Sequence, residues 1–210
     1  FVIQWAAMGQ ALEQDQIAAI ILAAGGSARM GRPKQLLPIG DRPMVRHVTA
    51  AVAALGLAQV VVVTGAHAEA VTTALADLPV QIVLNGSWAE GMSSSIRQGL
   101  RALRPEIRAV LLVLGDQPAL TPELLDLLVA RYRATGAPIV APFYRGRRGN
   151  PVLFDRALFP ELLAVQGDRG GRLLLERHRD GVERVDLDDP AVIVDIDSPQ
   201  DYKGLLGAVG

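Results

Sequence analysis

Short apolar runs alternate along the chain with segments whose apolar residues recur at helical spacing. The runs at residues 17–23, 60–63 and 109–114 are apolar throughout, with no alternation of apolar and polar positions. Such runs are typical of strands that are buried on both faces of a sheet. Weaker runs of the same kind predict further strands at residues 80–84, 139–141, 151–154 and 192–194.

Helical spacing predicts helices over residues 43–55, 68–76, 93–103 and 121–134. The last begins Thr121-Pro122-Glu123, in which threonine suits the N-cap and proline the first helical position. Strands that alternate with helices predict a mainly parallel sheet covered on both faces, hence a three-layer α/β/α sandwich. Residues 155–189 are expected to form a helical excursion and a hairpin at one edge.

Length and composition narrow the class of protein. The 210 residues suffice for one well-buried domain, which we place at residues 17–210. Residues 1–16 lack the charged-then-apolar layout of a signal peptide, so we interpret them as a short leader or cloning remnant. No apolar run approaches the roughly 20 residues of a membrane span. We therefore expect a cytoplasmic protein with no membrane partner.

Charge and cysteine content exclude several kinds of chemistry. The formal net charge of -1 argues against broad binding to nucleic acid, which needs many uncompensated cations. The chain has no cysteine, which excludes disulfides, thiolate metal sites and thiol catalysis. What remains is a globular enzyme or binding protein that acts on a small molecule.

A glycine-rich loop follows the first predicted strand and reads L-A-A-G-G-S-A-R-M-G-R-P-K over residues 22–34. Glycines let the backbone approach a ligand and turn its N–H groups toward phosphate oxygens. Gly26 and Gly31 have the spacing of a P-loop, but Arg32 follows where that motif has lysine. Ser27 breaks the dinucleotide pattern G-x-G-x-x-G. The loop therefore matches neither of the two commonest nucleotide motifs.

Lysine is rare in this chain, which makes its position in the loop informative. Lys34 and Lys203 are the only lysines among 21 basic residues. A surface turn that only needed positive charge would be expected to carry arginine, whereas a compact point charge suits a phosphate. We therefore expect the loop to bind a nucleoside triphosphate through Leu22, Ala23, Ala24, Gly25, Gly26, Ser27, Arg29 and Lys34.

The loop resembles the L-A-x-G-x-S-x-R-M-G-x-x-K signature of the MobA-like nucleotidyltransferases, which attach a nucleoside monophosphate to molybdopterin cofactor. The resemblance covers nearly all of residues 17–206 and implies the Rossmann-like sheet of nucleotide-diphospho-sugar transferases. Ala23-Ala24-Gly25 looks like the MocA-like cytidylyltransferase branch, since the guanylyltransferase branch tends to have Ala-Gly-Gly there.

Carboxylates that follow strands are the candidate metal ligands. Magnesium binds one or two carboxylates together with phosphate oxygens. Asp116 directly follows a buried run, and the resemblance places the metal-binding aspartate of the family in a similar G-D-x-P segment. Asp195 and Asp197 would share one face of a strand. We expect Asp197 to be the second Mg²⁺ ligand, as the resemblance implies, whereas a turn or a functional role is equally plausible for Asp195.

The resemblance also implies residues that contact the base and the acceptor. Gly91, Ser93 and Ser94 lie in an E-G-M-S-S-S segment near the nucleotide, although Ser93 alone could serve as a helix N-cap. The acceptor-binding residues implied in the same way are Gln117, Gly149, Asn150, Pro151 and Asp168.

Together these expectations describe a Mg²⁺-dependent nucleotidyltransferase. It would transfer CMP from CTP to the terminal phosphate of molybdenum–molybdopterin cofactor and release pyrophosphate, with Arg29, Lys34 and Asp116 as catalytic residues. A molybdoenzyme or its maturation chaperone would receive the product. Three alternatives stay open: transfer that uses GTP or a sugar phosphate, an NAD-dependent oxidoreductase, and a non-catalytic cofactor-binding or delivery protein.

Overall fold

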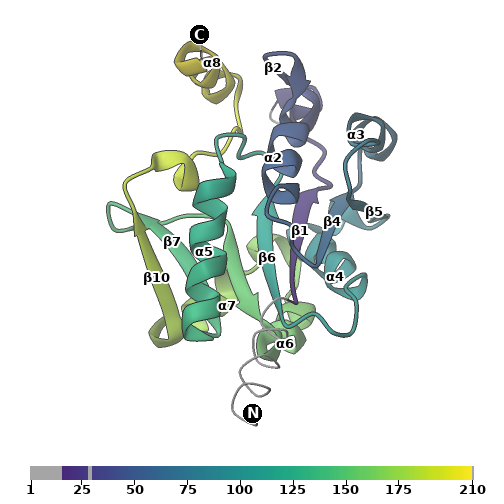
Figure 1. Cartoon of the computed structure of the whole chain (residues 1–210). Coiled ribbons are helices and arrows are strands. Elements are labelled where there is room, and N and C mark those ends of the chain that lie inside the picture. Colours follow the sequence, from purple (N-terminus) through teal and green to yellow (C-terminus); the bar gives the residue numbers. More distant parts are fainter. Residues whose placement is uncertain (1–15, 28–29, 210) are drawn as a thin grey trace.

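The computed structural model describes residues 16–27 and 30–209. Within these residues the chain forms an eight-stranded sheet with helices on both faces (Figure 1). The predicted three-layer α/β/α sandwich with a mainly parallel sheet is therefore confirmed. Residues 1–15, which make up nearly all of the expected leader, lie outside the described residues, as does Arg29 of the glycine-rich loop.

The strands of the main sheet are β1 (Ile17–Ala23), β4 (Gln59–Thr64), β5 (Gln81–Leu84), β6 (Ala109–Leu114), β7 (Ile139–Tyr144), β8 (Arg147–Arg148), β9 (Val152–Asp155) and β10 (Val182–Leu187). The α-helices are α2 (Met44–Ala53), α3 (Ala68–Ala74), α4 (Met92–Arg101), α5 (Pro122–Thr135), α6 (Phe159–Ala164), α7 (Arg172–Arg177) and α8 (Pro199–Val209). Between them lie the 3-10 turns η2 (Lys34–Leu36), η3 (Trp88–Glu90), η4 (Arg156–Leu158), η5 (Gly167–Arg169), η6 (Arg179–Gly181) and η7 (Pro190–Ile193), and a small pair of strands, β2 (Pro38–Ile39) and β3 (Arg42–Pro43).

The strand order is β10-β7-β9-β6-β1-β4-β5, with β8 beside β7. Strands β1, β4, β5 and β6 are parallel, whereas β9 is antiparallel to both of its neighbours. Strands β4 and β5 add on one side of β1, and β6 then adds on the other side. Such a switch in direction leaves a crevice beyond the carboxyl ends of the two central strands, here β1 and β6.

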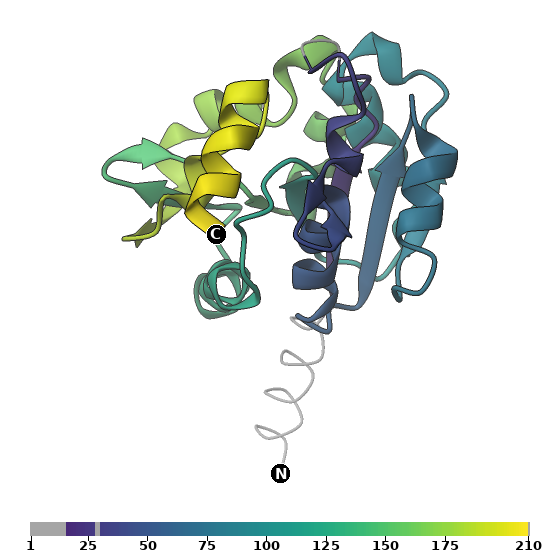
Figure 2. The same ribbon diagram turned by 90° about the horizontal axis from the view of Figure 1, so that it is seen from above.

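Each face of the sheet carries its own apolar cluster, which explains why the strands lack alternation. In β1, Ile17 and Ile21 pack with α2, α3 and α5, whereas Ile20 packs with α4, α6 and α7. Figure 2 shows these two sets of helices on opposite sides of the sheet. All three isoleucines are fully buried. Because both faces are covered, polar side chains of the central strands lie at the strand ends and in the loops that follow them.

The C-terminal part departs from the prediction at residues 155–189. The helical excursion is present as η4, α6, η5, α7 and η6, but no hairpin follows it in the described residues. Instead β10 pairs in parallel with β7, with Val182 opposite Ile139. The physical reason is that the helical crossover returns the chain to the end of the sheet at which β7 begins, as a parallel connection requires.

Residues 192–194 are not a strand, which corrects a second expectation. Pro190 begins the 3-10 turn η7, and the Asp189 side chain caps it by accepting a 2.8 Å hydrogen bond from the Ala191 N–H. Asp195 and Asp197 therefore lie in an irregular segment, not on one face of a strand. Ile196 between them is only 1% exposed, so it anchors this segment against the protein.

The predicted N-cap of α5 is confirmed, and the structure shows a further cap at the start of α8. Thr121 caps α5 and accepts a 3.3 Å hydrogen bond from the Leu124 N–H. Ser198 and Asp201 form a reciprocal capping box at the start of α8, with each side chain accepting from the backbone N–H of the other. None of the helices in the described part of the chain has both the length and the apolarity that a membrane crossing requires.

Candidate active site

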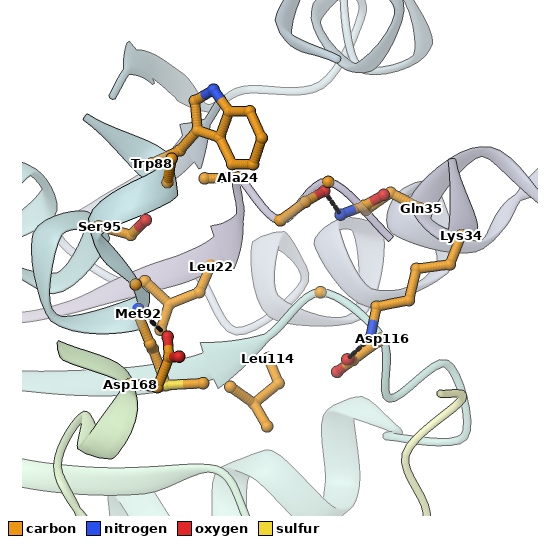
Figure 3. Close-up of a pocket in the computed structure, with 15 residues that line it drawn as sticks. Leu22, Ala24, Lys34, Gln35, Trp88, Met92, Ser95, Leu114, Asp116 and Asp168 are labelled. Atoms are coloured by element: carbon orange, nitrogen blue, oxygen red, sulfur yellow. Dashed lines mark hydrogen bonds and ion pairs between the residues drawn. The ribbon is translucent and has the colours of Figure 1, made fainter. Parts of the chain in front are cut away.

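A cavity of about 330 Å³ lies at the carboxyl ends of β1 and β6, where the strand order switches direction. Its walls come from the glycine-rich loop, the segment before α4, the end of β6 and η5 (Figure 3). The lining residues are Leu22, Ala24, Gly25, Gly26, Lys34, Gln35, Trp88, Ala89, Gly91, Met92, Ser95, Leu114, Gly115, Asp116 and Asp168.

The loop predicted to bind the nucleotide is held in shape by Ser27 and Gln35. The Ser27 backbone has a positive φ of 56°, a conformation that L-residues rarely adopt. Its Oγ accepts a 3.0 Å hydrogen bond from the Lys34 N–H and donates to Gln35 Oε1 at 3.1 Å. Gln35, only 3% exposed, donates in turn to the Gly25 carbonyl at 2.8 Å. Ser27 therefore shapes the loop from behind, and Gly25 and Gly26 face the cavity.

Lys34 joins two carboxylates that are far away in the sequence. Its Nζ lies 2.5 Å from Asp116 Oδ2 and 2.7 Å from Asp197 Oδ1. The Lys34 side chain is 16% exposed, and that of Asp116 is 17% exposed. Burial by itself lowers the pKa of Lys34, but the attraction and hydrogen bonds of Asp116 and Asp197 outweigh it, so the pKa is raised. The ammonium group therefore stays charged between the two carboxylates.

Asp116 has one oxygen that the protein leaves unpaired. Its Oδ2 contacts Lys34, whereas Oδ1 is buried and has no hydrogen-bond partner among the described residues. Gly115 places this carboxylate, because its N–H donates to the Leu22 carbonyl at 3.0 Å and a Cβ there would lie 3.0 Å from the same oxygen. A buried carboxylate oxygen without a donor fits a cation bound between the protein and a phosphate.

No cluster of three or more acidic or histidine side chains that could hold a metal ion occurs in the described part of the chain. Asp116 and Asp197 alone offer two carboxylates at this point, so a divalent cation held there would need phosphate or water oxygens as further ligands. The structure brings together three predicted residues, Lys34, Asp116 and Asp197, at one point of the cavity.

Gln117 is placed differently from the acceptor-binding role expected of it. Its side chain is fully buried, and Nε2 donates to Asp195 Oδ1 at 2.8 Å. Gln117 therefore ties the segment after β6 to the segment that carries Asp197, and it lines no part of the cavity. Burial, followed by repulsion from Asp116, raises the pKa of Asp195.

Ser93 and Ser94 at the start of α4 are buried and do not line the cavity. The N-cap of α4 is Gly91, so the alternative role of Ser93 as the cap is wrong. Ser93 is fully buried, and Ser94 is 3% exposed and donates to the Gly91 carbonyl at 2.8 Å. Asn85 donates to both Ser94 Oγ and Ser95 Oγ, at 2.8 and 3.0 Å. Of the three serines only Ser95 lines the cavity.

Gly91 and Trp88 belong to the wall opposite Lys34. Gly91 has a φ of 101°, and a Cβ there would meet Asp168 Oδ1 at 2.4 Å, so only glycine fits. Asp168 Oδ1 accepts a 3.2 Å hydrogen bond from the Met92 N–H, which fixes η5 against the start of α4 (Figure 3). The Trp88 ring lies near Ala24 at the far end of the cavity from Asp116 (Figure 3).

Of the residues predicted for the nucleotide, six line the cavity, whereas Ala23, Ser27, Ser93 and Ser94 support it from behind. Sequence reasoning missed Gln35, Trp88, Met92 and Leu114. Trp88 carried a usable signal, because it lies in the same polar segment as Gly91 and is one of only two tryptophans in the chain. Gln35 and Leu114 carried none, since their side chains are ordinary for a loop and a buried strand.

A second cavity of about 200 Å³ adjoins the first and shares Leu22, Met92, Leu114 and Asp168 with it. Asn150 and Asp168, both predicted on the acceptor side, line this second cavity. Gly149 and Pro151 are buried and lie beside it without lining it. A Cβ on Gly149 would meet the Val192 carbonyl at 2.3 Å, so this glycine allows η7 to pack closely.

The profile of the MobA-like NTP transferase domain family matches residues 19–182. A protein named nicotine blue oxidoreductase, from Paenarthrobacter nicotinovorans, is 32% identical over 198 residues, which cover 90% of this chain and 96% of that protein.

Several solved structures are similar to this chain over nearly its whole length. Rv0371c from Mycobacterium tuberculosis H37Rv has a TM-score of 0.82 at 31% identity, covering 91% of this chain and 98% of that one. A structure of Rv0371c in complex with manganese has a TM-score of 0.79 at 30% identity, covering 92% and 99%. A nucleotidyl transferase from Methanothermobacter thermautotroptrophicus has a TM-score of 0.77 at 26% identity, covering 92% and 97%.

Proposed function

The chain belongs to the family of MobA-like NTP transferase domains, and we propose that this nucleotidyltransferase transfers CMP from CTP to the terminal phosphate of molybdenum–molybdopterin cofactor. Pyrophosphate is the second product. The observation that carries the proposal is the cluster of Lys34, Asp116 and Asp197 in the crevice beyond β1 and β6. An ammonium group and two carboxylates beside the glycine-rich loop support nucleotidyl transfer, because they could align and stabilise the phosphates of a triphosphate bound there.

Asp116 and Asp197 are the residues that would hold a divalent cation, which we propose to be Mg²⁺. The unpaired, buried Oδ1 of Asp116 fits this role, and the related Rv0371c has been solved with manganese. When bound, the cation would neutralise charge on the phosphates. Lys34 adds a fixed positive charge beside the same phosphates, and Ser27 and Gln35 keep the loop N–H groups aligned. We propose that Arg29, which the sequence places in the same loop, contacts the phosphates too.

The proposed preference for CTP is supported by the limited room at the end of the cavity where we expect the base to bind. Ala24 puts a methyl group near Trp88, at the end of the cavity away from Asp116 (Figure 3). A pyrimidine needs less room there than a purine. The Ala23-Ala24 pair is also the feature by which the loop resembles the cytidylyltransferase branch.

The proposal is tested by measuring pyrophosphate release from CTP, GTP and ATP, with and without Mg²⁺, in the presence of molybdenum-loaded molybdopterin. We expect release from CTP only when Mg²⁺ and the acceptor are both present. Lys34→Ala and Asp116→Asn should each lower the rate at least a hundredfold, the typical effect of removing one electrostatic contact to a transition state. Lys203→Ala removes the chain's other lysine and serves as the matched control, with an unchanged rate. Release that is as fast from GTP would overturn the cytidylyl assignment.

A second candidate follows from the relative named as an oxidoreductase. At 32% identity this relative supports hydride transfer from NADH or NADPH as the alternative reaction. The paired carboxylates around Lys34 argue against it, because they would repel the diphosphate of a dinucleotide in the absence of a cation. Oxidation of NADH with a quinonoid dye as acceptor, followed by absorbance, decides between the two. Turnover that persists in Asp116→Asn would favour the oxidoreductase.

A further inference from the structure

A third cavity, of about 450 Å³, lies where β7, β8 and β10 face α7. Four arginines from four different elements line it: Arg148 of β8, Arg172 of α7, Arg179 of η6 and Arg184 of β10. Among the described residues that line this cavity, Glu176 is the only carboxylate. Guanidinium groups that converge on one hollow favour an oxyanion, because each planar group can donate two N–H bonds to it.

Neighbouring carboxylates neutralise only part of this arginine cavity. Glu176 accepts from Arg172 Nε at 3.1 Å, one helical turn away. Asp186 accepts from Arg184 at 3.0 Å, and the Arg184 guanidinium also lies 3.9 Å from the centre of the Phe143 ring. Arg148 and Arg179 have no carboxylate partner in the part of the chain that the structure describes. Two positive charges therefore remain for a ligand.

Arg148 is the more informative of these two arginines because it is half-buried. Its guanidinium donates to the Gly149 carbonyl at 3.0 Å, a neutral acceptor. Burial, followed by repulsion from Arg172, lowers the pKa of Arg148. A partly desolvated cation beside another cation is costly unless an anion joins them.

The arginine cavity is continuous with the candidate active site. It shares Arg148, Arg172 and Leu175 with the second cavity. The second cavity in turn shares Leu22 and Leu114 with the first cavity, where we expect the nucleotide to bind. The three hollows therefore run along one face of the sheet, from the ends of β1 and β6 to β10. The middle hollow is walled mainly by apolar side chains such as Phe154 and Val152.

We propose that the arginine cavity binds a second oxyanion group of the acceptor, at the end remote from the phosphate that is nucleotidylated. The acceptor is then an elongated molecule whose middle part lies in the second cavity. Its attacking phosphate lies beside Lys34 and Asp116, and its distal oxyanion lies between Arg148 and Arg179. The inference deepens the proposed nucleotidyl transfer and rests on it for the identity of the reaction.

The cavity is tested first without any nucleotide, by calorimetric titration of the protein with inorganic phosphate. We expect Arg148→Gln and Arg179→Gln each to weaken phosphate binding roughly tenfold, the loss expected for one charge-assisted contact. Arg179 is exposed, so its variant tests the cavity without disturbing a buried position. Arg177→Gln, on α7 but outside the cavity, is the matched control. Phosphate affinity equal to that of the wild type in both cavity variants overturns the proposal.

The second experiment measures pyrophosphate release with CTP, Mg²⁺ and the molybdenum-loaded acceptor. We expect Arg179→Gln to raise the KM for the acceptor roughly tenfold and to leave the KM for CTP unchanged. Weaker phosphate binding with an unchanged acceptor KM would mean that the cavity holds a free oxyanion, and the proposal would be wrong. If the wild type releases no pyrophosphate, the proposed transfer fails, and the phosphate titration alone decides whether the cavity is an oxyanion site.

Discussion

At the scale of single residues, Lys34 is the side chain that most clearly stabilises the candidate active site in the ligand-free protein. It bridges Asp116 and Asp197, which lie 82 and 163 positions away in the sequence. Asp195 adds a third carboxylate nearby, and its pKa is raised by burial and by repulsion from Asp116. Without the ammonium group, these carboxylates would repel one another in a partly buried crevice. Lys34 therefore stabilises the site before any ligand arrives.

Lys34→Met should therefore destabilise the metal-free protein by about 2 kcal/mol, between the values typical of exposed and buried ion pairs. Added Mg²⁺ should raise the melting temperature of the variant more than that of the wild type, because a cation can then occupy the position of the ammonium group. Thermal unfolding with increasing Mg²⁺ measures both effects, with Lys203→Met as the control. An equal response of variant and wild type to Mg²⁺ would show that Lys34 and the cation do not share a position.

The residue scale is also where sequence reasoning was least complete. The pattern G-D-Q-P located Asp116, but nothing in the sequence showed that Gln117 is buried and donates to Asp195. Polar residues beside a catalytic candidate look alike whether they face a ligand or hold a loop. The same ambiguity affected Ser93, which is fully buried behind the cavity. Contacts between segments far apart in the chain decide such cases, and composition does not report them.

At the scale of elements, local signals predicted most of the fold, because they act within a few residues. Apolar runs without alternating polar positions predicted the buried strands, and the Thr121-Pro122 pair predicted the start of α5. At residues 192–194 the predicted strand is absent, and a 3-10 turn takes its place. Three apolar residues suggested a strand, but Pro190 and the Asp189 cap favoured a 3-10 turn. Its Val192 carbonyl instead accepts from the Asn150 N–H at 2.7 Å, so tertiary contact outweighs β-propensity.

The capping box of α8 links an element to the site. Asp201 accepts from the Ser198 N–H at 2.7 Å and also from the N–H of Asp197 at 3.1 Å. Ser198→Ala and Thr121→Ala should each cost about 1 kcal/mol of stability, the usual value of an N-cap. Only Ser198→Ala should also weaken Mg²⁺-dependent nucleotide binding, since α5 carries no ligand of the cation. Denaturant unfolding and calorimetric titration measure the two quantities, and equal binding losses would contradict this view of Asp197.

A charged contact ties α2 to the segment after α3. Arg46 donates to both oxygens of Asp77, at 2.5 and 2.7 Å, and these hydrogen bonds lower the pKa of Asp77 to about 2 from 3.8. Because the folded pKa is the lower one, this stabilisation is fully present above about pH 4 and is lost as the pH falls toward 2. Asp77→Asn should therefore be less stable than the wild type at neutral pH, with a difference that shrinks in acid. Urea unfolding at several pH values measures it; a difference that is constant with pH would be inconsistent with the ion pair.

At the scale of the whole molecule, the sheet separates two apolar clusters that have different structural roles. The cluster packed with α5 only supports the fold, whereas the cluster on the other face also walls the second cavity. Leu128 belongs to the first and is fully buried, and Phe154 belongs to the second and is 1% exposed. This division could not be inferred from the strands alone, because both faces of each strand have the same apolar character.

Leu128→Ala and Phe154→Ala should both destabilise the protein, by about 2–5 and 3–5 kcal/mol respectively, because each leaves a cavity in a close-packed core. Their effects on the proposed reaction should differ. Phe154→Ala enlarges the second cavity directly, so it should raise the KM for the acceptor, whereas Leu128→Ala should leave that KM unchanged at temperatures where the variant is folded. Denaturant unfolding gives the stabilities, and pyrophosphate release gives the KM values, with the KM for CTP as an internal control in both variants. If Leu128→Ala shifted the acceptor KM as much as Phe154→Ala, the two faces of the sheet would be coupled, and the acceptor could not be assigned to one of them on this ground.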